Sequence, residues 1–184
     1  MKTITCFIAL WLMLPCLHAQ PYQLNLLKDI NPTGSSNARG MIAMNGIYYF
    51  NAYSSNEGFE LWRTDGTASG TFIVKDINPG SADASTSFYP VKMNNRIYFP
   101  ATTVANGMEL WSSDGTAAGT QLVADVNPGP TGSFIFQMTV YNNKVYFVTD
   151  HPTYGSELWS SDGTAAGTQI VKDINPGTGS SNIS

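Results

Sequence analysis

The chain has 184 residues, of which 12% are charged and 12% are aromatic, and its formal net charge is −4. The aromatic content, together with 17 glycines and 10 prolines, is typical of an all-β protein with many turns. Nine lysines and arginines form no basic cluster, which argues against a nucleic-acid partner.

Residues 1–19 have the pattern of a secretory signal peptide. Lys2 gives a positive start, residues 7–14 are apolar, and residues 17–19 form a cleavage site. The apolar run is too short for a membrane span, so we expect a secreted or cell-surface protein without a transmembrane segment. An alternative is a lipoprotein anchored at Cys16, for which the preceding proline is a poor fit. Both cysteines, Cys6 and Cys16, lie in this segment, so the mature chain would have none.

A motif Glu-Leu-Trp, then Asp-Gly-Thr, then Gly-Thr recurs about every 48 residues, at residues 60–71, 109–120 and 157–168. A residue present in every copy most simply serves the scaffold, since catalysis usually needs one asymmetric site. We therefore predict structural roles for the repeated tryptophans and aspartates: Trp62, Trp111, Trp159, Asp65, Asp114 and Asp162.

Each repeat reads as four short antiparallel strands. In the second copy the strands are expected at residues 88–93, 96–101, 108–112 and 120–126, with a hairpin turn at Asn94. The second strand of each copy is apolar on both faces, which indicates cover above and below. This pattern predicts an all-β fold, a β-propeller-like array of four-stranded antiparallel blades.

The repeats divide the chain into a signal peptide (1–19), a lone strand equivalent to a fourth blade strand (20–34), three repeats (35–80, 81–129, 130–177) and the start of a further repeat (178–184). Three blades with one lone strand form an incomplete ring, since propellers usually have four to eight. We expect a truncated product, a gene fragment, or one part of an assembled ring. Exposed blade edges predict self-association.

Two local roles follow from the motif. Trp62 and Leu61 project to opposite faces of one strand, and we expect the tryptophan to pack on the following blade and the leucine on the preceding one. In the turn, the Asp65 carboxylate is expected to accept hydrogen bonds from the backbone two residues on, which staples the hairpin.

At these residues the chain resembles the ELWxxDGT repeat family, over essentially the whole mature chain. The resemblance implies export and a repeat scaffold in a bacterial protein, and it carries over no catalytic residue. Residues 112–115 also resemble the Asp-box of sialidase-like propellers, which is structural. They depart from that box because Asp114 and Gly115 are adjacent and the tryptophan precedes them.

Acidic and amide side chains recur at the end of each fourth strand, around an Asn-Pro pair. They could ligate calcium with backbone carbonyls, or they could simply cap the local backbone. No other cofactor is expected. The candidate ligands are Asp29, Asp76, Asn78, Asp125, Asn127, Asp173 and Asn175.

The loops between the second and third strands differ in every copy, and variable loops on a repeated scaffold are where binding specificity tends to lie. The candidate binding residues are Tyr53, Glu57, Asn106, His151 and Tyr154. No nucleophile with an orienting group accompanies His151, so we predict no enzyme but an interaction or adhesion module for glycan or protein. The alternative is a fragment of a propeller glycoside hydrolase, for which the unrepeated acids are Glu57, Asp83 and Asp150.

Overall fold

The computed structural model describes residues 24–84 and 89–183. These residues form twelve β-strands in three four-stranded antiparallel sheets, and no helix among them is long and apolar enough to cross a membrane. The all-β prediction is therefore confirmed. The predicted signal peptide and both cysteines lie outside the described residues.

Within each sheet the strand order follows the chain, so each sheet is a simple meander. The first sheet contains β1 (Arg39–Met44), β2 (Ile47–Ser54), β3 (Gly58–Thr64) and β4 (Phe72–Lys75). The second contains β5 (Val91–Met93), β6 (Arg96–Thr103), β7 (Gly107–Ser113) and β8 (Gln121–Ala124). The third contains β9 (Phe136–Tyr141), β10 (Lys144–His151), β11 (Gly155–Ser161) and β12 (Gln169–Lys172).

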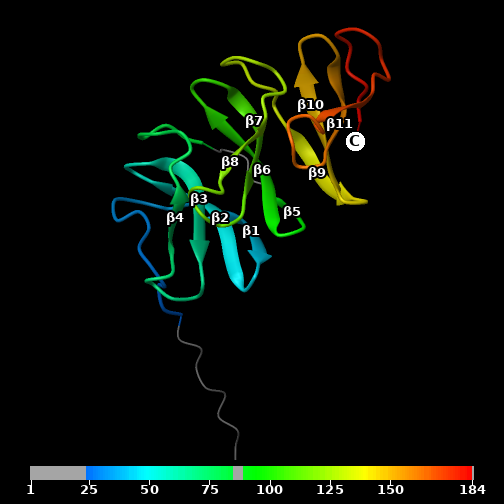
Figure 1. The fold of residues 1–184 in the computed structure, drawn as a ribbon. Helices are drawn as coiled ribbons and strands as arrows, with labels where there is room; N and C mark the ends of the chain where they lie inside the picture. Colours follow the sequence, from blue (N-terminus) through cyan, green and yellow to red (C-terminus); the bar gives the residue numbers. More distant parts are fainter. Residues whose placement is uncertain (1–23, 85–88, 184) are drawn as a thin grey trace, which may run out of the picture.

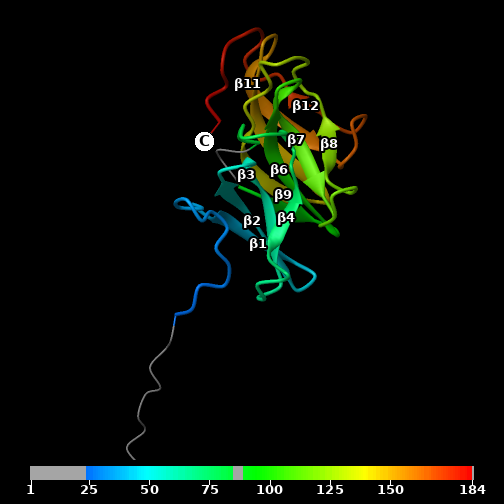
Figure 2. The same cartoon turned by 90° about the vertical axis from the view of Figure 1, so that its left-hand side faces the viewer.

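The three sheets follow one another in space as they do in sequence (Figure 1). The first and third lie at the two ends of the array and the second lies between them, as the perpendicular view also shows (Figure 2). The strands lie close to the predicted ranges, although β5 begins later than expected, and β8 begins one residue later and ends two residues earlier.

Turn chemistry and register repeat from sheet to sheet. Asn45 and Gly46 both have positive φ, 54° and 76°, as the tight hairpin between β1 and β2 requires. Trp62 pairs with Phe50 across β2 and β3, and the two other tryptophans pair with the equivalent phenylalanines. A bulge in the pairing with the fourth strand falls at the Leu-Trp step in all three sheets.

Two hydrophobic clusters hold the sheets face to face. Between the first and second sheets, Tyr49 and Leu61 pack with Phe99 and Trp111. Between the second and third sheets, the equivalent Tyr98 and Leu110 pack with Phe147 and Trp159.

These clusters show that the prediction of which neighbouring sheet the tryptophan and the leucine contact was wrong, since the two are exchanged. Trp111 packs on the preceding sheet, and Leu61 packs on the following one. Alternation along a strand fixes that the two side chains oppose each other, but it does not fix which neighbour each one meets. Val74 of β4 and Ile77 just after it lie in the same cluster as Leu61, so this whole face of the first sheet meets the second sheet.

The segment before β1 forms no strand in residues 24–38, which corrects the expectation of a lone strand there. A strand needs a hydrogen-bonded neighbour, and no described strand lies beside it. It nevertheless packs like a preceding unit. Ile30 covers the Trp62 side of the first sheet. Lys28 Nζ donates a hydrogen bond to the backbone oxygen of Thr71 (2.6 Å), and Lys75 Nζ makes the equivalent bond to the backbone oxygen of Thr120 (2.8 Å).

Candidate ligand-binding cleft

The Asp-Gly-Thr turns lie at one edge of the array and are closed by their own side chains. Asp65 Oδ1 accepts hydrogen bonds from the Thr67 hydroxyl (2.7 Å) and the Thr67 backbone N–H (2.9 Å). The same pair of bonds joins Asp114 to Thr116 and Asp162 to Thr164. These bonds, from the hydroxyl first and then the backbone, lower the pKa of all three carboxyls. They are the bonds expected from the sequence, and they commit the aspartates to the turn.

The glutamate of each Glu-Leu-Trp motif is fully buried, which the sequence analysis missed. Glu60 accepts hydrogen bonds from the backbone N–H groups of Ile77 and Asn78, both at 3.0 Å, and so ties β3 to the end of the fourth strand. Glu109 does the same with Val126 and Asn127. Burial raises the pKa of Glu60 to about 7 and also raises that of Glu109. The sequence feature that could have indicated this burial is a glutamate that precedes Leu-Trp within a strand in every copy.

The repeated asparagines shape the connections that leave each fourth strand. Asn78 Nδ2 donates a hydrogen bond to the backbone oxygen of Asp83 (3.2 Å), and Asn127 Nδ2 donates one to the backbone oxygen of Gly132 (2.6 Å). Asn175 makes the equivalent bond to Ser180 (3.2 Å). Local backbone capping, one of the two roles foreseen for these residues, therefore accounts for their amide nitrogens.

The calcium hypothesis stays a prediction. Within residues 24–84 and 89–183, no group of three or more histidine, cysteine or acidic side chains could hold a metal. Asp76, Asp125 and Asp173 each have one buried carboxylate oxygen without a hydrogen-bond partner, while Asp29 is exposed in the N-terminal segment. An unpartnered buried oxygen of this kind is where an ordered water or a cation would bind.

The first two variable loops use their polar side chains internally. Glu57 accepts a hydrogen bond from the Ser54 hydroxyl, and Tyr53 packs on Phe59 with ring centroids 5.3 Å apart. Asn106 donates to Asp125 Oδ2 at 2.7 Å. These three predicted binding residues therefore hold their own loops.

The third loop is built around an aromatic stack. The His151 ring lies 5.6 Å from the Trp159 ring and 4.9 Å from the Tyr154 ring, and His151 Nδ1 accepts a hydrogen bond from the Thr153 N–H (3.1 Å). Burial lowers the pKa of His151, which favours the neutral ring. Tyr154 supports this loop, while His151 also faces a cleft.

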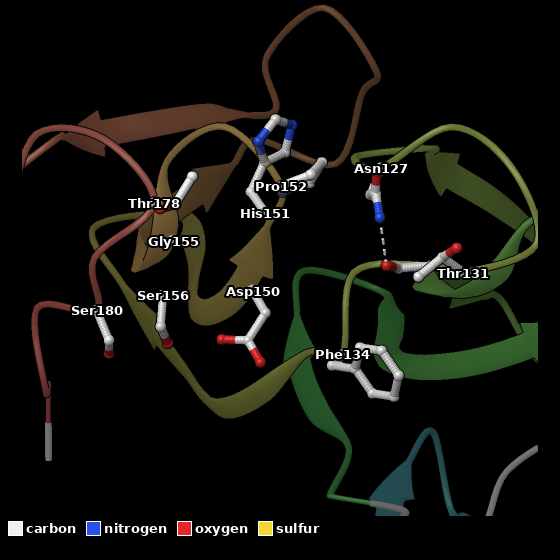
Figure 3. Close-up of a pocket in the computed structure, with 11 residues that line it drawn as sticks. Asn127, Thr131, Phe134, Asp150, His151, Pro152, Gly155, Ser156, Thr178 and Ser180 are labelled. Carbon is white, nitrogen blue, oxygen red and sulfur yellow. Dashed lines mark hydrogen bonds between the residues drawn. The ribbon is translucent and has the colours of Figure 1, made fainter.

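A cleft of about 480 Å³ opens beside this loop, between the connection that follows β8 and the segment that follows β12. Figure 3 shows the Asp150 carboxylate and the Ser156 hydroxyl lying between the Phe134 ring and the C-terminal segment. The cleft is lined by side chains from three separate segments, namely Asn127, Thr131, Phe134, Asp150, His151, Pro152, Ser156, Thr178 and Ser180. Of the five predicted binding residues, only His151 lines it.

Phe134 is the aromatic residue in the lining of this cleft, and it was not among the binding residues expected from the sequence. Its backbone is left-handed, with φ 47°, and its side chain is 54% exposed. A bulky residue rarely adopts this conformation, which costs about 1–2 kcal/mol. The same ring borders a second cavity of about 240 Å³, together with the exposed rings of Tyr89 and Phe136. Strain that holds an aromatic ring in water is a feature of functional sites.

Comparison with known proteins adds no relative to this picture. No protein-family model matches the chain, and no curated protein matches it. The resemblance to the ELWxxDGT family therefore stays a proposal, and the function has to be argued from the cleft.

Proposed function

We propose that the chain is a non-catalytic, secreted or cell-surface repeat scaffold, similar to ELWxxDGT proteins, which binds glycan in the cleft lined by residues 127–156, Thr178 and Ser180. In this proposal the three sheets are blades of a propeller-like array. The stacking of consecutive sheets through equivalent clusters supports that arrangement. The observation that carries the proposal is the cleft itself, with an exposed aromatic ring beside a carboxylate and several hydroxyls.

The composition of the cleft suits a sugar. The C–H face of a pyranose packs on an aromatic ring such as Phe134, while its hydroxyls need hydrogen-bond acceptors and donors around the edge. Asp150 offers two acceptor oxygens, and Ser156 and Thr131 offer hydroxyls that can donate or accept. A few polar groups placed around an apolar surface are what orient a small ligand.

The charge of the cleft favours a neutral sugar over an acidic one. None of the residues that line it is a lysine or an arginine, and Asp150 contributes a negative charge. Burial lowers the pKa of His151 and so favours the uncharged form of its ring. Sialic and uronic acids would therefore bring a carboxylate toward Asp150 without a cation to pair with it.

A binding role is supported over hydrolysis by the positions of the unrepeated acids. A typical glycosidase needs two carboxyl groups flanking one bond. Asp150 lines the cleft, but Asp83 Oδ1 accepts the Phe59 N–H (3.0 Å) and Glu57 is bonded to Ser54 in the first sheet. In the hydrolase alternative, neither Asp83 nor Glu57 lines the cleft to serve as the second carboxylate.

The proposal is tested by measuring binding of the purified chain to an array of neutral and acidic glycans, followed by titration calorimetry on any hit. Phe134→Ala and Asp150→Asn should each weaken binding at least tenfold. Tyr48→Ala is the matched control, because Tyr48 is a similarly exposed aromatic (53%) on the first sheet.

Binding that survives both cleft variants, or that falls equally in the control, would contradict the proposed site. Selective binding of acidic glycans would contradict the charge argument. Release of free sugar from a bound glycan, lost in Asp150→Asn, would favour the hydrolase alternative. Capture of a protein ligand with no glycan binding would also overturn the proposal.

A further inference from the structure

The outer face of the third sheet carries the same apolar side chains that the other two sheets bury. Five equivalent positions are buried in the first sheet and again in the second: Met44, Tyr49, Leu61, Val74 and Ile77, then Met93, Tyr98, Leu110, Val123 and Val126. In the third sheet these positions are Tyr141, Tyr146, Leu158, Val171 and Ile174. Tyr141, Val171 and Ile174 are 71%, 48% and 57% exposed. The sequence keeps an apolar interface here that none of residues 24–84 and 89–183 covers.

The tyrosines show what fits on such a face. The Tyr49 hydroxyl occupies the space beside Gly115 that a side chain would need, because a Cβ added to this glycine would lie 2.1 Å from the hydroxyl oxygen. The Tyr98 hydroxyl lies beside Gly163 in the same way, and a Cβ there would be 2.4 Å away. At the other end of the array, a Cβ on Gly66 would meet nothing within 4 Å. Tyr146 on the third sheet and Gly66 on the first are thus two unfilled halves of one repeated contact.

The C-terminal segment already follows the path of a connection into another unit. The Ser133 N–H donates to the Met108 oxygen (2.8 Å), and the Ser133 oxygen accepts the N–H of Asp150 on the next sheet (3.0 Å). Ser181 is the residue equivalent to Ser133 in the next repeat, and its N–H donates a hydrogen bond to the backbone oxygen of Ser156 (3.0 Å). Its hydroxyl also donates to Glu157, as the Ser133 hydroxyl does to Glu109.

The first sheet offers the matching face, which, among the residues that the structure describes, is covered by residues 24–36. Those residues repeat the sequence that ends the third unit, since Leu-Lys-Asp-Ile-Asn-Pro at 27–32 matches Val-Lys-Asp-Ile-Asn-Pro at 171–176. Their cover is thin, because Leu24 and Leu26 are 98% and 79% exposed. A third sheet placed there would bring Ile174 onto Trp62 and Lys172 to the Thr71 oxygen, where Ile30 and Lys28 now lie.

We propose that the third sheet of one chain docks on the first sheet of a second copy in place of residues 24–36, and that two copies close into a ring of six sheets. The contact joins different surfaces of the two copies, so it must either close into a ring or propagate. Two copies of three sheets give a number within the four to eight blades of known propellers, whereas three copies give more. The glycan-binding cleft plays no part in this argument.

The test is the solution mass by light scattering over a concentration series. The purified chain should reach twice its chain mass, and the double variant Val171→Glu/Ile174→Glu should have the mass of one chain at every concentration. Val104→Glu is the matched control, since Val104 is an equally apolar side chain, 79% exposed in a loop of the second sheet, and it should leave the dimer intact. Thermal unfolding and circular dichroism establish that each variant is folded.

A second variant probes the other face of the contact. Gly66→Asn adds a side chain where Tyr146 of the second copy would lie, and asparagine tolerates positive φ, so dimer dissociation should increase at least tenfold. A wild-type chain that stays monomeric at high concentration overturns the proposal. So does a mass that the face variants leave unchanged, or one that grows without limit, since open association contradicts a closed two-copy ring.

Discussion

The edge of the array that carries the Asp-Gly-Thr turns and the edge that carries the loops between second and third strands differ in how closely their contacts repeat from sheet to sheet. At the turn edge, each Asp-Gly-Thr turn makes the same hydrogen bonds at nearly the same distances. At the opposite edge, the three loops are held by a Ser–Glu bond, an Asn–Asp bond and a histidine stacked on tryptophan. Side chains that repeat maintain the scaffold, and side chains that differ are free to take on binding. The following predictions test this division.

The largest effect is expected from the repeated tryptophans. Trp111 is 8% exposed and packs between the first two sheets, so Trp111→Ala should lower the free energy of unfolding by about 3–5 kcal/mol. Urea denaturation measures this. Tyr48→Ala should change it by less than about 0.5 kcal/mol because Tyr48 is exposed. Similar losses in the two variants would contradict the assignment of the tryptophan to the core.

The aspartates of the two edges should behave in opposite ways. Asp114→Ala removes the acceptor of two hydrogen bonds in a repeated turn and should cost about 1–2 kcal/mol of stability, with glycan binding unchanged. Asp150→Ala should cost less than about 0.5 kcal/mol and abolish binding. Urea denaturation measures the stability of both variants, and calorimetry on the same samples measures their glycan binding. Loss of binding in Asp114→Ala without unfolding would show that the edges are not separate in function.

Phe134 should show the cost of holding a ring in the cleft. Because its φ is 47°, Phe134→Gly should be about 0.5–1 kcal/mol more stable than Phe134→Ala, since only glycine adopts this backbone freely. Both variants should lose binding. Equal stability of the two variants in urea would show that the backbone relaxes once the ring is gone, and the strain argument would then fail.

The last expected effect is a pH dependence from the buried glutamates. The folded-state pKa of Glu60 is about 7, above its ordinary 4.5, so the folded chain binds more protons than the unfolded chain between these values. This contribution to stability is fully present below about pH 4.5 and is lost as pH rises through about 7. The melting temperature should fall by a few degrees from about pH 5 to about pH 7.5.

The matched variant is Glu60→Gln, whose melting temperature should fall less over the same range. Some slope should remain because the pKa of Glu109 is also raised. Glu157→Gln is the control. Burial would raise the pKa of Glu157, but hydrogen bonds from Ser181 and the backbone of Asn175 and Ile174 outweigh it and lower the pKa. A slope that Glu60→Gln leaves unchanged would assign the effect to other groups.

Much of the fold could be predicted because it rests on local rules. Short apolar runs, hairpin turns that begin with asparagine and the Asp-Gly-Thr staple each act within a few residues, and they set the strands and hairpins. The lone N-terminal strand was predicted wrongly because a strand depends on a distant partner as well as on its own sequence. Residues 24–31 carry the right side chains but have no described strand to pair with.

The cleft could be predicted only in part. Variable loops pointed to His151, yet Phe134 comes from a connection and Ser156 from the start of β11. Tyr53, Glu57 and Asn106 lie in loops of the same kind, but their side chains are satisfied within their own sheets. Whether a polar side chain faces a ligand or its own loop depends on partners far along the chain.

The sequence by itself determined that this protein is built from three equivalent four-stranded units, because a period of about 48 residues is visible without any structure. Only the tertiary structure decided that Trp111 and Trp159 face the preceding sheet and that one glutamate per unit is buried beneath the chain that leaves it. It also decided that a cleft opens beside the third loop. The physical reason is that strand alternation is local, whereas the choice of neighbour follows from the connection between sheets and from the packing it permits.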